Sequence, residues 1–393
     1  MSQDPVVIVN GARTAMGGFQ GCLAGLSAPQ LGAATIRAAL ARAGVAPEQV
    51  EDVIMGCVLP AGLKQGPARQ AMRLAGLADA TGAVTVNKLC GSGMRATMFA
   101  HDQIIAGSSE IMVAGGMESM SNAPYLLDKA RGGLRMGHGQ VLDHMFLDGL
   151  EDAETGRLMG AFAQEVADKK SITREQMDDF AVESLKRANA AIDNGWFKDE
   201  ITPVTVPSRS GDTVVDTDEQ PGNAKVEKIP QLKPAFAKDG TVTAANASSI
   251  SDGASALVLM KASKAKALGL SPLARIVGHS TNSQHPSEFT LAPCGAISKI
   301  LKKTGWAAAD VDLWEINEAF AMVAMMPLTE FGIEHSRVNI HGGACALGHP
   351  IGSTGSRLIL TLIHALKRTG GQQGIATLCI GGGEATAVAV ELL

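Results

Sequence analysis

The sequence has little aromatic content and no strong excess of charge of either sign. Aromatic residues make up 4% of its 393 residues, charged residues 19%, and the formal net charge is −5. Proteins that bind nucleic acid over a broad surface usually carry a strong positive excess, so we expect no nucleic-acid partner. No run of about 18 purely apolar residues occurs, which argues against a membrane span. The stretch MSQDPVVIVNGARTA lacks a basic segment followed by a long apolar one, so we expect no signal peptide and a cytoplasmic location.

Cysteine spacing excludes two further classes of protein. The six cysteines are widely scattered and form no CxxC pair: Cys22, Cys57, Cys90, Cys294, Cys345 and Cys379. This pattern fits neither a small disulfide-bonded scaffold nor a cysteine-based zinc site, and we expect no metal. Any chemistry at these positions is therefore expected to involve single thiols.

What the chain has in abundance is glycine and apolar residues. Glycine occurs 45 times and hydrophobic residues make up 46%. This balance is typical of tightly packed α/β layers, and the length allows about two domains.

Two parts of the chain resemble each other. VAPEQVEDVIMGC at 45–57 resembles WAAADVDLWEINE at 306–318, and VAGGMES at 113–119 resembles CIGGGEA at 379–385. Each part reads as an apolar strand, a glycine turn that opens an apolar helix, and a second strand. In the first helix, Met94, Met98 and Ile105 are spaced to share a buried face. This order predicts parallel strands with helical crossovers, in two similar halves related by a pseudo-twofold axis.

A region of different character separates the two halves. Residues 122–249 carry more charge and several turn signals, and TREQMDDFAVESLKRANAAIDNG at 173–195 predicts one clear helix. Thr173 and Gln176 form a plausible capping box, and Gly195 a plausible stop. We therefore predict an N-terminal half at 1–121 plus 250–272, an inserted loop domain at 122–249 and a C-terminal half at 273–393.

Cys90 is the first candidate catalytic residue. It lies in NKLCGSGMRA, where a strand gives way to a helix predicted to start near Gly91. Unpaired N–H groups at a helix N-terminus favour a thiolate and can hold an oxyanion, so we expect a lowered thiol pKa and a nucleophile. A buried structural cysteine is an equally open reading of this motif alone.

The C-terminal half supplies the other candidates. Cys379 precedes three glycines in LCIGGGEA, which allow a substrate to approach the backbone. A pseudo-twofold axis would bring Cys379 and Cys90 toward one cleft. His349 in GHPIG can act as a base toward a thiolate, although a structural histidine fits the local sequence as well. Asn317 and Glu318 end an apolar strand at the edge where α/β sites are usually built.

These motifs together resemble the thiolases. NKLCGSGMRA, INEAFA, GGACALGHPIGSTGSR and LCIGGGEA occur in order, and GGMESMSNAPYLL and TAANASSISDGASA extend the resemblance over nearly the whole chain. The similarity is strongest to thiolases of the acetyl-CoA C-acetyltransferase type. It implies a duplicated α/β/α/β/α layer fold and a reversible condensation of two acetyl-CoA molecules to acetoacetyl-CoA and CoA.

The resemblance also implies a role for each motif residue. Cys90 carries the acetyl group as a thioester, His349 activates that thiol, and Cys379 moves a proton on the methyl carbon of the second acetyl-CoA. Asn317 holds a water that forms one oxyanion hole together with His349. The backbone N–H groups of Cys90 and Gly381 form the other.

Further implications concern the substrate and the assembly. The acyl-CoA site would use Ser248, Met159, Ala319 and Phe320, with no metal or redox cofactor. RGGLRMGHGQVLDHMFLDGL at 131–150 resembles a tetramerisation loop, which implies a homotetramer. The chain departs from the family pattern at three positions: Leu158, Gly222 and Glu384.

Other readings remain open. A 3-ketoacyl-CoA thiolase of longer chain length shares most of these motifs. Carrier-protein ketoacyl synthases share the fold but lack a second catalytic cysteine, which Cys379 argues against. A non-catalytic acyl-CoA-binding protein would not need both cysteines and His349. A papain-like protease does not fit the doubled α/β pattern.

Overall fold

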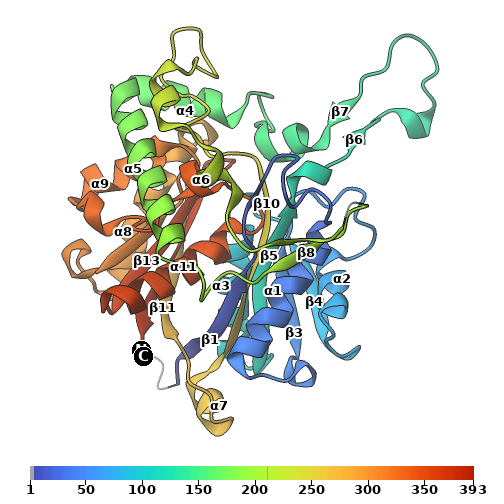
Figure 1. Ribbon diagram of the computed structural model, residues 1–393, viewed down its shortest axis with the longest axis vertical. Coiled ribbons are helices and arrows are strands. Elements are labelled where there is room, and N and C mark those ends of the chain that lie inside the picture. Colours follow the sequence, from blue (N-terminus) through green and yellow to red (C-terminus); the bar gives the residue numbers. More distant parts are fainter. Residues whose placement is uncertain (1–3, 210) are drawn as a thin grey trace.

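Strands and helices are interspersed along the chain in the computed structural model, which describes residues 4–209 and 211–393 (Figure 1). Ten strands form the main sheet, in the order β12-β13-β14-β11-β1-β10-β5-β3-β4, with β2 paired to β10. Their bounds are β1 Val6–Arg13, β2 Gly17–Gly18, β3 Asp52–Gly56, β4 Gly82–Val86, β5 Ile111–Ser119, β10 Ser251–Lys261, β11 Ala274–Ser283, β12 Leu313–Ile316, β13 Gln373–Ile380 and β14 Glu384–Leu392.

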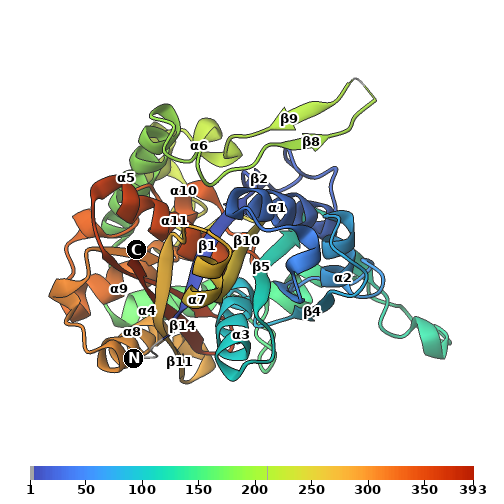
Figure 2. The same ribbon diagram turned by 90° about the horizontal axis from the view of Figure 1, so that it is seen from below.

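The helices cover both outer faces and fill the centre. Their bounds are α1 Ala28–Ala43, α2 Pro67–Leu74, α3 Ser92–Ala106, α4 Met159–Lys169, α5 Arg174–Asp193, α6 Glu219–Asn223, α7 Ala262–Ala267, α8 Ala292–Thr304, α9 Ala321–Phe331, α10 Ala344–Leu347 and α11 Thr354–Thr369. Figure 2 shows α1 and α2 on one side, α8 and α9 on the other, and α3 packed with α11 between them. Within the described residues, no helix combines the length and apolar character needed to cross a bilayer.

The strand order has the symmetry that the internal repeat predicts. From one edge the order runs β4-β3-β5-β10-β1, and from the other it runs β12-β13-β14-β11. The two series meet where β1 and β11 pair antiparallel over Val7–Ile8 and Ala274–Arg275. This arrangement confirms the predicted α/β layer fold with two similar halves.

The sheet is mixed, and this qualifies the prediction of parallel pairing. β3 pairs parallel with β4 and β5, and β12 pairs parallel with β13, as helical crossovers require. β13 and β14 are antiparallel because only the three glycines 381–383 separate them, and a connection that short can only form a hairpin. β5 and β10 are likewise antiparallel, with the inserted region between them.

Central helix α3 buries most of the predicted face. Met94 and Met98 are fully buried, but Ile105 is 44% exposed, so its predicted burial is wrong. Ile104 is buried instead. The difference arises because α3 packs on both a sheet and α11, so its buried stripe is not centred on the three residues chosen from spacing.

The inserted region adds two projecting hairpins and two long helices. β6 (Tyr125–Leu126) and β7 (Leu142–Asp143) form the base of a hairpin that extends away from the body (Figure 1), and β8 (Val204–Val206) pairs with β9 (Thr213–Val215). At the start of α5, the hydroxyl of Thr173 accepts a bond from the Gln176 N–H at 3.2 Å. The Gln176 side chain accepts one from the Thr173 N–H at 2.9 Å, which confirms the predicted capping box. The exact domain boundaries stay a prediction.

A buried ion cluster fastens this region to the N-terminal half. Arg13 at the end of β1 donates two bonds to Asp218, at 2.7 and 2.9 Å, and one to Glu200 at 2.8 Å. All three side chains are almost fully buried. Removing one member of such a buried pair typically lowers the free energy of unfolding by about 3–5 kcal/mol, because the remaining charge is left unpaired.

Candidate active site

Cys90 lies in a tight turn directly before α3, whose N-cap is Gly91, as the sequence predicts. The turn is held by Ser92, whose hydroxyl accepts from the Lys88 N–H at 2.8 Å and donates to the Leu89 carbonyl at 2.7 Å. A side chain at Gly91 would overlap Ile380 at the end of β13. Glycine lets the turn from one half lie directly against a strand of the other, and a larger residue would force the Ile380 side chain to move.

Cys379 approaches Cys90 from the C-terminal half. It is fully buried, one residue before the end of β13, opposite Ala385 of β14. In the turn that follows, Gly382 and Gly383 have φ values of 82° and 86°, a conformation that side chains disfavour. This turn directs the N–H of Gly381 at the sulfur of Cys90. The two glycine-flanked cysteines that the sequence singled out thus meet at one place.

The Cys90 thiol is neutral at rest. Desolvation raises its pKa to about 11, although the N–H groups of Gly381 and of Cys90 itself act to lower it. The residue keeps some solvent exposure, yet protein atoms crowd its sulfur. We predicted that the helix N-terminus would lower the pKa of Cys90. This prediction is wrong, because burial raises the pKa by more than the N–H groups lower it. A nucleophile of this kind needs a base beside it.

Cys379 is also a thiol at rest. Burial raises its pKa well above the ordinary value, and the charge that Cys90 would carry raises it further. This coupling shows that the two sulfurs are near neighbours. Since like charges disfavour each other, only one of the two is expected to be ionised at a time.

His349 presents a proton-accepting nitrogen. Its Nδ1 lies 2.6 Å from the hydroxyl oxygen of Thr354, and that hydroxyl donates to the Pro350 carbonyl at 3.0 Å. The hydroxyl proton is thus already used, so Thr354 accepts from Nδ1–H and the lone pair lies on Nε2. Burial, followed by the charge of Arg357, lowers the pKa of His349 to about 3, so the ring is neutral at physiological pH.

Asn317 faces the same nitrogen. It directly follows β12, where its N–H donates to the Thr377 carbonyl at 3.0 Å. Its side-chain Nδ2 lies 3.5 Å from Nε2 of His349. Its Oδ1 is buried and has no hydrogen-bond partner among the described residues. A buried acceptor without a partner is unusual, and a bound water would satisfy it. This fits the water-holding role that the resemblance implies, which stays a prediction.

Glu118, at the end of β5, is a site residue that the sequence reading did not assign a role. Its carboxylate accepts from the N–H groups of Val58, Leu59 and Gly352 at 3.0, 3.1 and 2.8 Å, and from the Cys57 thiol at 3.7 Å. Burial raises the pKa of Glu118 to about 7, although these hydrogen bonds act to lower it. All four partners donate, which is the arrangement that an ionised carboxylate satisfies. Glu118 therefore ties the loop that carries His349 to the N-terminal half.

The predicted substrate-binding residues border the same place. A side chain on Gly381 would contact the sulfur of Met159 at 3.4 Å, so Met159 faces the glycine turn. The Ser248 N–H donates to the Ala319 carbonyl at 2.9 Å. Ala319, Phe320 and Met159 belong to the apolar cluster that encloses Cys379. Met159, Ala319 and Phe320 thus form an apolar wall on the side of Cys379.

The three departures from the family pattern have distinct surroundings. Leu158 is the N-cap of α4 and offers no side-chain cap. A side chain at Gly222 would meet open space. Glu384 forms an ion pair with Lys88, two residues before Cys90. None of the three replaces Cys90, Cys379 or His349.

Comparisons with known proteins match this arrangement over nearly the whole chain. The model of the thiolase N-terminal domain matches residues 6–263, and that of the thiolase C-terminal domain matches residues 270–392. The chain is 50% identical to an acetyl-CoA acetyltransferase of Pseudomonas aeruginosa, with 98% of each chain covered. It is 49% identical to one of Escherichia coli, with 98% of this chain and 99% of the relative covered. The crystal structure of the Bacillus anthracis acetyl-CoA acetyltransferase superposes with a TM-score of 0.97 at 42% identity, covering 99% of each chain.

Proposed function

Because the chain belongs to the thiolase family, we infer that it is an acetyl-CoA acetyltransferase that condenses two acetyl-CoA molecules to acetoacetyl-CoA and CoA, and catalyses the reverse thiolysis. The observation that carries this inference is the meeting of two thiols, Cys90 and Cys379, at one place, in a chain whose His349 is a neutral imidazole with Nε2 able to accept a proton. One thiol can hold an acyl group while the other moves a proton.

The first half-reaction acetylates Cys90. As its sulfur attacks the carbonyl carbon of acetyl-CoA, the thiol proton passes to Nε2 of His349. The bond between that carbon and the CoA sulfur breaks, and the leaving sulfur takes the proton of Cys379. CoA departs as a thiol and leaves acetyl-Cys90, a protonated His349 and a Cys379 thiolate. The thiolate offsets the cost of a charged His349 in a buried site.

The second half-reaction forms the carbon–carbon bond. The Cys379 thiolate removes a methyl proton from a second acetyl-CoA, and the resulting carbanion attacks the carbonyl of acetyl-Cys90. The bond to sulfur breaks, and Cys90 regains its proton from His349. Acetoacetyl-CoA leaves and every group returns to its starting state.

Two sets of donors stabilise the charges that develop on oxygen. The N–H groups of Cys90 and Gly381 converge at the Cys90 sulfur, where the carbonyl oxygen of the acetyl group is held. Protonated His349 and a water on Asn317 Oδ1 serve the thioester oxygen of the second substrate. Removing a single donor of this kind typically lowers kcat by about 10²–10³-fold.

The reaction as written needs no metal or redox cofactor, since thiols, an imidazole and N–H groups account for every proton and charge. The substrates and products are acetyl-CoA, acetoacetyl-CoA and CoA. We place the protein in the cytoplasm and in fatty-acid metabolism. Its six free cysteines support a reducing compartment.

Chain length separates this function from its closest alternative, a 3-ketoacyl-CoA thiolase of longer chain length. We expect the highest kcat/KM for thiolysis with acetoacetyl-CoA and a decline with 3-ketohexanoyl-CoA and longer substrates. The reason is that Met159, Ala319 and Phe320 pack in one apolar cluster with Cys379 and would limit the room for a longer acyl chain. A rising kcat/KM with chain length would favour the alternative.

We propose a homotetramer built through the hairpin of β6 and β7. This hairpin exposes five large apolar side chains, which is unusual for a free surface: Tyr125, Leu127, Leu134, Met136 and Val141. Met136 is 96% exposed. Edge strand β4 also exposes Val84, at 44%, and offers unpaired backbone groups for a second contact. Light scattering should give four chains for the wild type and two for Met136→Glu with Leu134→Glu. A wild-type dimer at all concentrations would contradict the proposal.

A further inference from the structure

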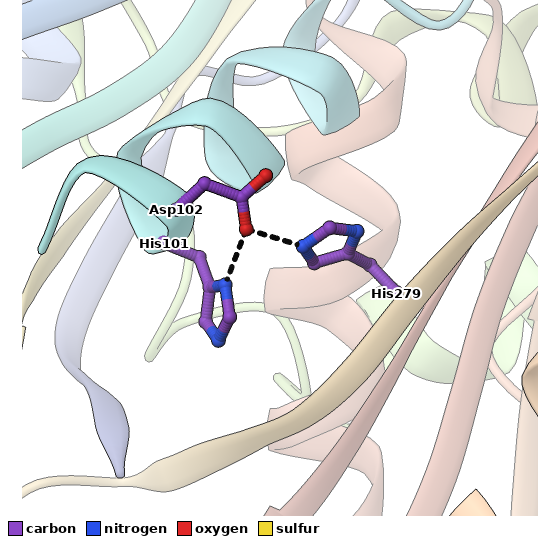
Figure 3. A group of neighbouring side chains, drawn as sticks. All are labelled: His101, Asp102 and His279. Atoms are coloured by element: carbon purple, nitrogen blue, oxygen red, sulfur yellow. Dashed lines mark hydrogen bonds and ion pairs between the residues drawn. The ribbon is translucent and has the colours of Figure 1, made fainter. Parts of the chain in front are cut away.

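A second polar cluster lies where α3 passes β11. It consists of His101 and Asp102 from the C-terminal part of α3 and His279 from β11 (Figure 3). One carboxylate oxygen of Asp102 lies 3.0 Å from Nδ1 of His101 and 2.8 Å from Nε2 of His279. The two rings are nearly perpendicular, at 86°, with their centroids 5.1 Å apart. Residues from both halves of the chain thus place three possible ligand atoms close together.

This donor set suits a divalent transition metal. Two imidazole nitrogens and a carboxylate oxygen are ligands that zinc, cobalt and nickel accept. The three atoms all lie within 4.8 Å of one another. Tetrahedral bonds of about 2.0–2.2 Å separate neighbouring ligand atoms by about 3.3–3.6 Å. The observed oxygen–nitrogen separations of 2.8 and 3.0 Å are hydrogen-bond distances, so the side chains must move apart by about half an ångström for a cation to enter.

Burial also favours the site. The side chains of His101 and His279 are 17% and 13% exposed, whereas Asp102 is 55% exposed, so the rings are held by packing and solvent reaches the carboxylate. An ionised carboxylate only accepts hydrogen bonds, so the two ring nitrogens that face Asp102 carry protons in the empty cluster. A metal that binds there takes the place of these two protons.

One neighbouring charge limits the affinity. The ammonium of Lys303 donates to the His279 carbonyl at 3.1 Å. The same charge repels a bound cation. With three protein ligands and this ammonium nearby, the affinity should fall well below that of a structural zinc site with four ligands.

We propose that His101, Asp102 and His279 bind a divalent cation of the zinc class, with water in the remaining positions, and that the ion fastens α3 of the N-terminal half to β11 of the C-terminal half. Cysteine spacing predicts no metal site, and it could not reveal this one because the histidines come from distant parts of the sequence. The site lies about 16 Å along α3 from Cys90 and takes no part in acyl transfer.

Anomalous diffraction tests the location directly. Crystals of the full chain soaked in zinc chloride, measured on both sides of the zinc absorption edge, should show a peak about 2.0–2.2 Å from the three ligand atoms. A peak at the cysteines with none at this cluster would overturn the proposal.

Thermal unfolding tests the ligands in solution. Zinc chloride should raise the unfolding midpoint of the wild type and of His138→Ala, a control at an exposed histidine on the β6–β7 hairpin. The zinc-dependent rise should be lost in His279→Ala and in Asp102→Asn, which changes a half-exposed side chain and should leave the fold intact. With cobalt chloride, the wild-type spectrum should gain bands that both variants lack and that persist in Cys90→Ala. An equal rise in Asp102→Asn and the wild type, or no rise in either, would contradict the proposal.

Discussion

The hydroxyl oxygen of Thr354 lies 2.6 Å from Nδ1 of His349, and this contact decides which imidazole nitrogen can accept a proton. Because the Thr354 hydroxyl donates to the Pro350 carbonyl, it must accept from Nδ1–H. The lone pair then lies on Nε2, which faces Asn317. A threonine five residues after the histidine therefore acts as the positioning residue for the base.

Thr354→Val should keep the shape of the side chain but remove this acceptor. The imidazole can then carry its proton on either nitrogen, so kcat should fall by about tenfold or more. A general base typically accelerates a reaction by about 10²–10⁴-fold, which sets the upper limit of this loss. Steady-state thiolysis of acetoacetyl-CoA measures the effect. The matched control is Thr361→Val, since Thr361 is buried in the same helix and its hydroxyl has no partner among the described residues. Equal rates for the two variants would exclude the positioning role.

The pKa values predict how Cys90 reacts with an alkylating agent as pH changes. The pKa of Cys90 is raised to about 11 and that of His349 is lowered to about 3, so the resting pair is a thiol and a neutral imidazole. The rate of iodoacetamide inactivation should therefore climb with the thiolate fraction, about tenfold per pH unit from pH 7 to 10. A rate that is constant between pH 5 and 8 would instead indicate a resting ion pair of thiolate and imidazolium.

Glu118→Gln should lower kcat but raise the rate at which the Cys90 thiol is alkylated. The amide can no longer accept all of the N–H bonds from Val58, Leu59 and Gly352, so the loop of His349 loosens and kcat falls. The negative charge of Glu118 raises the Cys90 pKa, and its loss should speed alkylation at pH 8. Glu110→Gln, at an exposed glutamate that pairs with Lys264, is the control and should change neither rate. Slower alkylation in Glu118→Gln would show that its role is structural only.

Cys379→Ser should uncouple the two half-reactions. The serine hydroxyl is a far weaker proton donor and base than the thiol, so condensation and thiolysis should fall by about 10²–10⁴ or more. Acetyl transfer to Cys90 loses the proton that Cys379 gives to the leaving sulfur, but CoA can leave as a thiolate, so this transfer should slow and remain detectable. Exchange of the acetyl-CoA methyl protons with deuterated solvent should fall in parallel with condensation. If methyl exchange survived while acetylation of Cys90 was lost, the roles of the two cysteines would be reversed.

Local patterns predicted the elements of the fold well. The two strand–helix–strand units, the Thr173 capping box and the helix after Cys90 all follow from spacing, glycine and capping residues. The antiparallel strands were missed because β14 carries no helical crossover, and Ile105 was misplaced because α3 is covered on two sides. Neither fact is visible in a short window of sequence.

For the candidate site, the sequence predicted that two thiols lie close together, but it did not predict their electrostatics. Glycines beside Cys90 and Cys379 revealed both thiols, and the structure brings them together. The sign of the Cys90 pKa shift was not accessible, because it depends on how tightly two halves enclose the sulfur. Glu118 and Thr354 were also missed, since their partners become neighbours only when the loops around His349 fold.

The most direct test of the central claim is the intact mass of the protein after mixing with acetyl-CoA. The wild type should gain one acetyl group per chain, and free CoA should restore the original mass by removing it. Cys90→Ala should gain none while keeping the wild-type unfolding midpoint within about 2 °C, since one buried thiol makes a small contribution to the core. An acetyl adduct of equal yield on Cys90→Ala would contradict the assignment of Cys90 as the acyl carrier, and with it the mechanism.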